Sequence, residues 1–313
     1  MNRSKENFMR RAVRAGALLV PFLLVAAGPR LAAAAPGETG FAFLKLGVGA
    51  RAMGMGSAYV ALADDPTASY WNPAGLASIK NTQVTAMHNE WILDFRQEYA
   101  AVGTPLGPGS VGFSFSGFYG DEIEQRDDTG ILTGHYGFND IAVSGAYGLK
   151  VTKGLDGGAA VRYVREMIDN EDATALTVDL GALYHLGESG VSFGGAVQNL
   201  GGDAKFVAES FPLPLTYRLG GAFSKHLDSL KGRGTLSAEY RKARADDGHF
   251  HVGGEYAYKD HVALRVGGKF GYDDQDVTFG VGVMKDWFRF DYALAPISSD
   301  LGTTHFFSVT GSF

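Results

Sequence analysis

From about residue 82 to its end, the chain alternates apolar residues with small or charged ones at a period of two. In VALRVGGKF, residues 262–270, every second position holds Val, Leu, Gly or Phe, and the positions between them hold Ala, Arg, Gly and Lys. Successive side chains of a β-strand point to opposite faces of the sheet, so the pattern predicts strands with one apolar face. We place fourteen such strands, centred near residues 85, 100, 114, 144, 162, 180, 194, 219, 238, 254, 265, 281, 291 and 308.

The opposite face distinguishes a soluble β-sandwich from a closed transmembrane β-barrel. Many of its residues are Gly, Ala or Ser, as at Gly112, Ser114 and Ser116, which are too small to cover a sheet but leave space inside a closed ring. The connectors after odd-numbered strands, such as 120–137 and 201–214, are also longer and more acidic than the others. Outer-membrane barrels have short turns at one end and long loops at the other, which a sandwich does not require. We therefore predict an all-β fold, a transmembrane antiparallel barrel of fourteen strands.

Composition agrees with a barrel in lipid. Glycine accounts for 44 of 313 residues and aromatic residues for 12%, while the mean hydropathy of −0.04 is ordinary. Only alternate residues of a barrel strand face lipid, so a high aromatic content and a mild mean hydropathy occur together. Trp287 and Tyr292 are expected in an aromatic belt at the membrane interface rather than in a ligand-stacking site. The chain ends with Phe313 on an amphipathic strand, which is similar to the signal that outer-membrane assembly machinery reads.

The first 35 residues have the pattern of a cleaved secretory signal peptide. Five Lys/Arg precede the apolar residues 15–28, and LAAAA supplies small residues for cleavage after Ala35. Pro21 and Gly28 interrupt a run that is too short for a membrane-spanning helix. We expect the chain in the outer membrane of a Gram-negative-type bacterium. The leader holds six of the 28 Lys/Arg but one of the 34 Asp/Glu, so the mature chain is acidic and no nucleic-acid partner is expected.

Residues 36–80 do not alternate, and we predict that they form a plug inside a barrel made by residues 81–313. Gly47, Gly49 and Ala52 fit the G-x-G-x-x-G/A spacing of a dinucleotide-binding loop. That fold needs strands alternating with helices, and the pattern after residue 80 contains no such helices. Closely spaced glycines also let backbone approach backbone, as a chain inside a narrow lumen must do. The glycines are thus expected to serve packing.

Two polar features of this segment carry further predictions. Asp65 followed by Pro66 is typical of a helix N-cap with a first-turn proline, so TASYWN is predicted to be a short helix that ends at Pro73. Arg51 is the one basic residue in the glycine-rich stretch, and we expect it to pair with an acid in the lumen and fix the plug.

Charged residues on the inner face of neighbouring strands alternate in sign. They predict a ladder of ion pairs between wall and plug, and an ion-selectivity filter is the alternative. His249, His251 and Glu255 share one face, but histidine pairs on one strand are common by chance, so we predict no metal site. The predicted ladder consists of Arg218, Glu239, Glu255, Arg265, Lys269, Arg289 and Asp291.

An outer-membrane hydrolase is the competing class of protein. It would need Ser, His and an acid at one place. His305 and Ser308 fall on opposite faces of their strand, and the sequence places no acid beside His185 and Ser192. The chain has no cysteine and therefore no thiol nucleophile, thiolate zinc site or disulfide. We expect neither enzymatic activity nor a cofactor.

Six segments carry a resemblance to a known family. They are GARAMGMGSAYVALADDPTASYWNPAGLA (49–77), AVQNLG (196–201), PLPLTYRLGGAF (212–223), AEYRKARADDGHFHVGGEY (238–256), ALRVGGKFG (263–271) and DYALAPISSDLGTTHFFSVTGSF (291–313). With them the chain resembles the PorV/PorQ family of outer-membrane proteins, which is similar in turn to the FadL-type transporters of hydrophobic compounds. The resemblance covers essentially the whole mature chain and implies a fourteen-stranded barrel with its N-terminal segment inside.

FadL-type plugs carry an Asn-Pro-Ala element, and the resemblance places it at Asn72, Pro73 and Ala74. The plug residues to which we assign a role are Arg51, Gly54, Met55, Gly56, Asp64, Asp65, Asn72, Pro73 and Ala74.

The resemblance implies one of two noncatalytic functions. A PorV-like protein would work in type IX secretion, receiving exported cargo from secretion-system proteins, here through the loops at 120–137 and 201–214. A FadL-like protein would let fatty acids or other hydrophobic molecules pass through the lumen and a lateral gap. We predict the first function and keep the second as the alternative. Outer-membrane lipid and the assembly machinery are expected partners of both.

Overall fold

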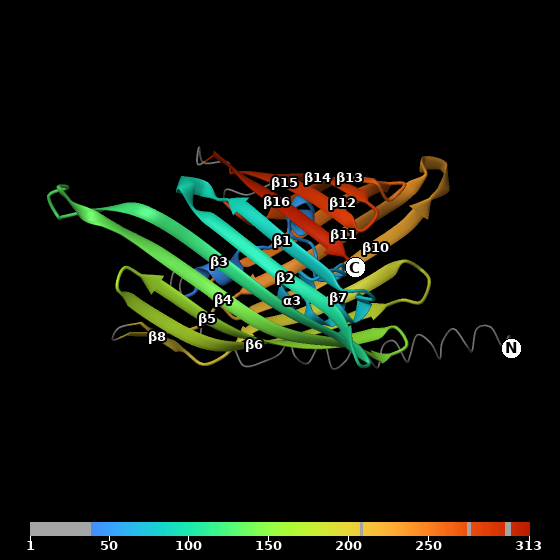
Figure 1. Ribbon diagram of the computed structural model, residues 1–313, viewed down its shortest axis with the longest axis horizontal. Helices are drawn as coiled ribbons and strands as arrows, with labels where there is room; N and C mark the ends of the chain where they lie inside the picture. Colours follow the sequence, from blue (N-terminus) through green and yellow to red (C-terminus); the bar gives the residue numbers. More distant parts are fainter. Residues whose placement is uncertain (1–38, 207–208, 274–276, 298–301) are drawn as a thin grey trace. The chain divides into compact units, whose positions relative to one another are not determined.

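The computed structural model describes residues 39–206, 209–273, 277–297 and 302–313. The predicted fold class is confirmed: fourteen strands form one closed antiparallel barrel (Figure 1). In chain order they are β1 Gln83–Glu90, β2 Arg96–Leu106, β3 Gly109–Arg126, β4 Leu132–Thr152, β5 Leu155–Ile168, β6 Glu171–His185, β7 Val191–Leu200, β10 Thr216–Leu227, β11 Gly232–Ala243, β12 Gly248–Tyr258, β13 Val262–Phe270, β14 Val277–Lys285, β15 Phe288–Ile297 and β16 Gly302–Ser312. The predicted signal peptide lies outside the described residues.

Each barrel strand pairs with its neighbours in sequence, with one insertion. β7 pairs directly with β10, because a separate two-stranded sheet of β8 (Ala204–Phe206) and β9 (Glu209–Phe211) lies between them in the chain. β1 and β16 close the ring, with Gln83 opposite Ser312. No edge of the barrel sheet is left open, as a sheet in lipid requires.

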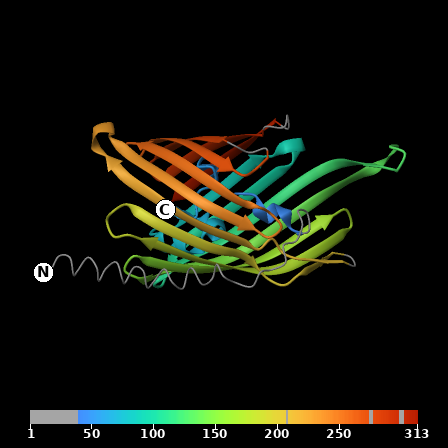
Figure 2. The same ribbon diagram turned by 180° about the vertical axis from the view of Figure 1, so that it is seen from behind.

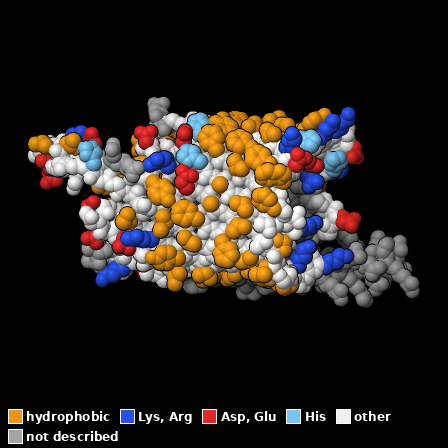
Figure 3. All heavy atoms as spheres, in the orientation of Figure 1, with side chains coloured by type: hydrophobic (Ala, Val, Ile, Leu, Met, Phe, Trp, Pro, Cys, Tyr) orange, Lys and Arg blue, Asp and Glu red, His pale blue; other side chains and the backbone are white. Residues whose placement is uncertain are grey.

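The period-two pattern separates a lipid face from a lumen face. On β14, Phe279 is 47% exposed and Val283 52%, whereas Thr278 on the opposite face is 2% exposed. Figure 3 shows apolar side chains spread over the visible wall of the barrel, with charged side chains gathered toward its two ends. Among the described residues, no helix is long and apolar enough to cross a membrane.

The connectors differ from the prediction in where strand gives way to loop. Residues 120–137 are mostly strand, since β3 has 18 residues and β4 has 21, and the hairpin extends well beyond its neighbours (Figure 1). A register shift between Gly120 and Ile123 marks a bulge, beyond which pairing continues to Arg126 and Leu132. Likewise 201–214 contains β8 and β9 rather than open loop. We call the end with these long connections the hairpin end, and the opposite end the turn end.

The described residues before β1, 39–82, lie inside the barrel, and their helical structure consists of short turns (Figures 1 and 2). Its hydrogen bonds and buried side chains connect it to most of the strands around the ring. The turns are η1 Ala42–Lys45, α2 Ala50–Gly54, α3 Ala68–Trp71 and η2 Pro73–Ser78. Two further 3-10 turns, η3 Ile92–Asp94 and η4 Asp228–Leu230, belong to connectors of the barrel.

The predicted helix at TASYWN forms and ends before Pro73 as predicted, but its N-cap differs from the prediction. Thr67, not Asp65, is the N-cap of α3. The Asp65 carboxylate instead accepts from the Thr67 backbone N–H at 3.0 Å and from its hydroxyl at 2.5 Å. Pro73 ends α3 and begins η2, because its fixed φ also suits a first helical position. Helix α2 was not predicted, since glycine disfavours helix and only packing in the lumen stabilises the turn.

Candidate functional site: the plug and the lumen

The C-terminal end of α2 lies against the wall, backbone to backbone. A Cβ added at Gly280 on β14 would lie 3.1 Å from the Cα of Gly54, and a Cβ at Gly267 on β13 would overlap the amide of Gly56. Gly56 has φ +64°, and its N–H donates to the Thr278 hydroxyl at 3.0 Å. Met55 lies between Gly54 and Gly56 in the chain and is 1% exposed. Glycine on both plug and wall is what permits this approach.

Asn72 fixes the Asn-Pro-Ala element by three hydrogen bonds. Its Nδ2 donates to the carbonyl of Val60 in the plug at 2.8 Å and to that of Ala182 on β6 at 3.1 Å. Its Oδ1 accepts from the Ala74 N–H at 3.2 Å. The side chain is fully buried. One residue thus connects two parts of the plug to the barrel wall.

Three wall glycines make space for this element. Gly148 is opposite Gly158, and Gly158 is opposite Gly181, so the three form a row across β4, β5 and β6. A Cβ at Gly158 would overlap the Pro73 backbone, and one at Gly181 would overlap the Asn72 side chain. The row lets the plug pack directly against the backbone of the wall near the turn end.

Arg51 pairs with a lumen acid. Its Nε and Nη2 donate to the two carboxylate oxygens of Glu255 on β12, each at 3.0 Å, and its Nη1 donates to Asp64 at 2.7 Å and to the Tyr59 hydroxyl at 3.1 Å. Arg265 on β13 donates to the same Glu255 at 2.6 Å. The Glu255 carboxylate therefore lies between a plug guanidinium and a wall guanidinium.

The ion pairs continue from the wall back to the plug. Arg265 donates to Asp291 on β15 at 2.8 Å, and Arg289 Nε lies 2.8 Å from the second oxygen of Asp291. Arg289 Nη2 donates to Asp65 of the plug at 2.7 Å, and the Tyr59 hydroxyl lies 3.3 Å from Asp65. Because Tyr59 also contacts Arg51, the contacts close into a ring, which we call the plug ring.

A second cluster holds the middle of the plug. Arg218 on β10 donates to Glu239 on β11 at 2.5 Å and to Gln198 on β7 at 2.7 Å. The other oxygen of Glu239 accepts from the backbone N–H groups of Tyr59 and Val60, both at 2.9 Å. Six of the seven predicted ladder residues thus belong to these two clusters. The seventh, Lys269, lies in a separate cavity described below.

The histidines of β12 point inward but are engaged by other groups. His251 Nδ1 lies 2.7 Å from the Gly56 carbonyl, and its Nε2 lies 3.1 Å from the Tyr272 hydroxyl. Since a carbonyl only accepts, Nδ1 carries the proton and Tyr272 donates to Nε2. His249 stacks on Tyr272 at 3.8 Å, and Glu255 is bound in the plug ring. Among the described residues, no group of three metal-ligating side chains is assembled.

The expectation that no acid lies beside His185 is wrong. His185 Nε2 is 3.4 Å from Asp156 on β5, because register brings the ends of β5 and β6 together. Ser192 on β7 pairs with His185 on β6, but the Ser192 hydroxyl donates to the Ala61 carbonyl at 2.9 Å. The hydroxyl therefore points to the plug instead of completing a Ser-His-acid arrangement.

The aromatic residues near the C-terminus lie on the outer surface. The Trp287 ring is 5.6 Å from that of Phe313 and 5.9 Å from that of Phe288. Phe313 is 71% exposed, and its N–H donates to the Thr82 carbonyl at 2.8 Å, beside the start of β1. The Tyr292 hydroxyl forms a hydrogen bond of 2.8 Å with His305 Nδ1 on the same outer face.

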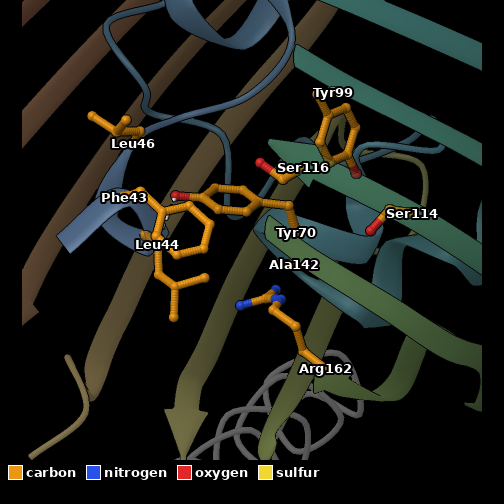
Figure 4. Close-up of a pocket in the computed structure, with 9 residues that line it drawn as sticks. All are labelled: Phe43, Leu44, Leu46, Tyr70, Tyr99, Ser114, Ser116, Ala142 and Arg162. Carbon is orange, nitrogen blue, oxygen red and sulfur yellow. Dashed lines mark hydrogen bonds between the residues drawn. The ribbon is translucent and has the colours of Figure 1, made fainter. Parts of the chain in front are cut away.

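Apolar side chains line the lumen on the side of β3 to β6. Phe43, Leu44 and Leu46 of the plug face Tyr99 and Ala142 of the wall around a pocket of about 10 Å³, which is drawn in Figure 4. Its lining also includes Tyr70, Ser114, Ser116 and Arg162. The apolar packing continues toward the hairpin end. We call the whole set the apolar side: Phe41, Phe43, Leu44, Leu46, Phe118, Ala142, Val164, Ala173, Ala175, Ala204, Phe206, Phe211 and Leu213.

Toward the hairpin end, Phe118 of the apolar side packs with two further phenylalanines. Phe95 of the β1–β2 connection packs edge-on to Phe118 at 6.0 Å and to Phe138 at 5.0 Å. All three are half-buried. They form a half-buried aromatic cluster next to the apolar side.

A larger cavity of about 230 Å³ lies on the other side of the plug, against β10 to β13. Its cations are Lys45, Arg218, Arg241 and Lys269, and Asp246 is its acid. Lys45 lies 3.1 Å from Asp246. Leu46, Met53, Trp71, Trp91 and Tyr272 supply apolar and aromatic surface, and Leu46 also lines the apolar pocket. We call this space the basic cavity.

Sequence reasoning missed the basic cavity. Arg241 follows Glu239 by two residues, so the period that places Glu239 in the lumen also places Arg241 there. Lys45, Trp91 and Tyr272 carried no signal, because they lie in the plug and in connectors where no period applies.

Comparison with solved structures finds the same barrel fold in several transporters and channels. The Ralstonia pickettii toluene transporter TbuX matches with a TM-score of 0.63 and 16% identity over 85% of this chain and 98% of that one. The Pseudomonas putida toluene transporter TodX matches with a TM-score of 0.61 and 14% identity over 84% and 96%. The monoaromatic hydrocarbon channel CymD matches with a TM-score of 0.61 and 13% identity over 85% and 98%.

Sequence comparison adds less. A protein-family model described as an uncharacterised protein family, UPF0164, matches residues 26–174. No functionally curated protein matches the chain in sequence. These solved structures share the fold of this chain, and Gram-negative outer-membrane channels use that fold.

Proposed function

We propose that the chain is an outer-membrane channel through which small hydrophobic molecules pass without chemical change. The observation that carries this proposal is the apolar side of the lumen, which runs from the Phe95, Phe118 and Phe138 cluster to the pocket around Leu46. A buried apolar lining with few polar groups is typical of sites for hydrophobic ligands. The fold it shares with two toluene transporters and a monoaromatic hydrocarbon channel supports the proposal.

The segment Phe41–Leu46 closes this route. Phe41 is fully buried with its ring 5.7 Å from that of Phe211, and its N–H donates to Glu166 at 2.8 Å. It has φ +54°, which is uncommon for a bulky residue and costs on the order of 1–3 kcal/mol. Passage requires this segment to shift, and the strained backbone lowers the free energy needed to do so.

Uptake by intact cells tests the proposal. Cells of a Gram-negative host that produce the protein are expected to take up radiolabelled toluene faster than cells with an empty vector. Leu44→Asn places a polar amide in the apolar side and is expected to slow uptake several-fold. Leu132→Asn, at an exposed position of the β3–β4 hairpin, makes the same change outside the route and should have no effect. Equal uptake by producing and empty-vector cells would refute the proposal.

The finer PorV/PorQ assignment, with a role in type IX secretion, is a second candidate. Its support is the long β3–β4 hairpin, which carries Ile131 and Leu132 at 64% and 46% exposure and thus offers apolar contact to another protein. Secretion-system proteins or cargo should then co-purify with the chain and be lost when the loops at 120–137 and 201–214 are deleted. Unchanged co-purification would contradict it. We propose a noncatalytic role in either case.

A further inference from the structure

The basic cavity holds a buried guanidinium edge that no described residue uses. Arg241 is 6% exposed, and its Nη1 donates to the Tyr272 hydroxyl at 3.0 Å. Its Nε and Nη2 have no hydrogen-bond partner among the described residues, and protein atoms cover both, so a ligand in the cavity reaches them only when a neighbouring side chain shifts. Burying a charged donor without a partner is costly, so an acceptor that bonds to both atoms would be stabilised here.

The two unused atoms have the geometry for a carboxylate. Nε and Nη2 lie on one edge of the planar guanidinium and bind the two oxygens of a carboxylate as a pair. Arg51 shows this arrangement in the same molecule, since its Nε and Nη2 each donate to Glu255 at 3.0 Å. The acids near Arg241 are committed elsewhere: Asp246 pairs with Lys45, and Glu239 pairs with Arg218.

The rest of the cavity suits an aromatic ring. Trp71, Trp91 and Tyr272 line it together with Leu46 and Met53. Protein cavities of about 150 Å³ hold benzene, so the 230 Å³ found here is enough for one ring with a carboxylate. A ring next to several cations is also favoured by their attraction to its face.

We propose that the basic cavity binds a small aromatic carboxylate of benzoate size, held by the Nε and Nη2 atoms of Arg241 with its ring among Trp71, Trp91 and Tyr272. This rests on the proposed function and names a substrate class for it: small organic anions in addition to neutral hydrophobic molecules. The bound ligand is connected to the plug, because Arg241 donates to Tyr272, Tyr272 donates to His251, and His251 donates to the Gly56 carbonyl.

Titration of the purified full-length barrel in detergent micelles tests the site, with binding followed by isothermal calorimetry. Sodium benzoate is expected to bind at least about tenfold more tightly than benzamide, which has the same ring but no charge. It should also bind more tightly than acetate, which has the charge but no ring. Equal affinities for benzoate and benzamide would overturn the carboxylate assignment, and equal affinities for benzoate and acetate would overturn the assignment of the ring.

Variants locate the site. Arg241→Gln is expected to weaken benzoate binding at least about tenfold and to leave benzamide binding unchanged. Arg233→Gln removes the same charge from an exposed position of the same strand and should change neither. Full benzoate affinity in a folded Arg241→Gln barrel would overturn the proposal. If that variant does not fold, Arg241→Lys keeps the charge but not the paired edge. It should bind benzoate more weakly than wild type, and unchanged affinity would overturn the paired geometry.

The outcomes separate this inference from the proposed function. Toluene uptake by cells without benzoate binding would refute the basic cavity as a carboxylate site and leave the channel proposal standing. Benzoate binding that depends on Arg241 in a protein that speeds no uptake would support the site and refute the channel.

Discussion

Replacing Glu255 by glutamine tests whether the plug ring holds the plug in the lumen. The carboxylate accepts three hydrogen bonds from Arg51 and Arg265, and its side chain is 8% exposed. Removing one partner of a buried ion pair costs roughly 3–5 kcal/mol when the remaining charge is left without compensation. Here Arg51 keeps Asp64 and Arg265 keeps Asp291. We therefore expect Glu255→Gln to lower the free energy of unfolding by about 2–3 kcal/mol.

Equilibrium unfolding in urea, with the barrel refolded in lipid vesicles, measures this loss. Trp71 is fully buried in the plug, so a variant that retains only this tryptophan reports release of the plug. Glu124→Gln is the matched control, because Glu124 pairs with Arg126 at an exposed place and should cost less than about 0.5 kcal/mol. Combining Glu255→Gln with Arg51→Met should give a coupling energy of about 1–3 kcal/mol. A loss no larger than that of the control, or no coupling, would refute the role of the ring.

Two further predictions concern packing and assembly. Gly158→Ala is expected to destabilise the barrel by about 1–3 kcal/mol, because its Cβ would overlap the Pro73 backbone. Gly145→Ala should be neutral, because its Cβ would meet the Phe113 ring at 3.7 Å. Urea unfolding of both variants measures the difference. Phe313→Ser is expected to reduce the amount of folded protein in the outer membrane several-fold. Because Phe313 is exposed, the change should alter the free energy of unfolding in vesicles by less than about 0.5 kcal/mol. Equal amounts of folded wild-type and variant protein in the outer membrane would contradict an assembly role.

The barrel could be predicted from the sequence because lipid and lumen impose opposite demands on alternate residues. All fourteen predicted strand centres fall within strands of the barrel. The strand ends could not be predicted equally well. Beyond the lipid the alternation is no longer required, yet backbone pairing of β3 with β4 continues to Arg126 and Leu132. A sequence pattern that reports environment therefore stops before the hydrogen-bonded strand does.

The lumen site was predictable in kind but not in detail. Period two assigns a residue to the inner face, but it does not give its height along the barrel axis or the path of the plug. A partner for Arg51 was expected, and the register that puts Glu255 opposite Arg265 decides which acid it meets. The carboxylate contact at His185 was missed for the same reason, since it depends on how the ends of β5 and β6 align. Distances between strands come only from the closed ring.

The plug is held unevenly, and this bears on how a channel of this kind would open. From Gly49 to Ala74 its hydrogen bonds reach Glu255, Glu239, Ser308 and Ala182 on four different strands, and glycine contacts seat it directly on the wall. The segment Phe41–Leu46 has fewer polar contacts among the described residues. The Phe41 N–H donates to Glu166, Lys45 donates to Asp246, and the Tyr70 hydroxyl donates to the Leu44 carbonyl. The segment also contains the strained Phe41 and separates the apolar side from the basic cavity. A shift of this segment alone would join the two spaces around Leu46, while the plug ring and the Asn72 contacts stay in place. In the channel that we propose, opening would thus require far less than removal of the plug from the barrel.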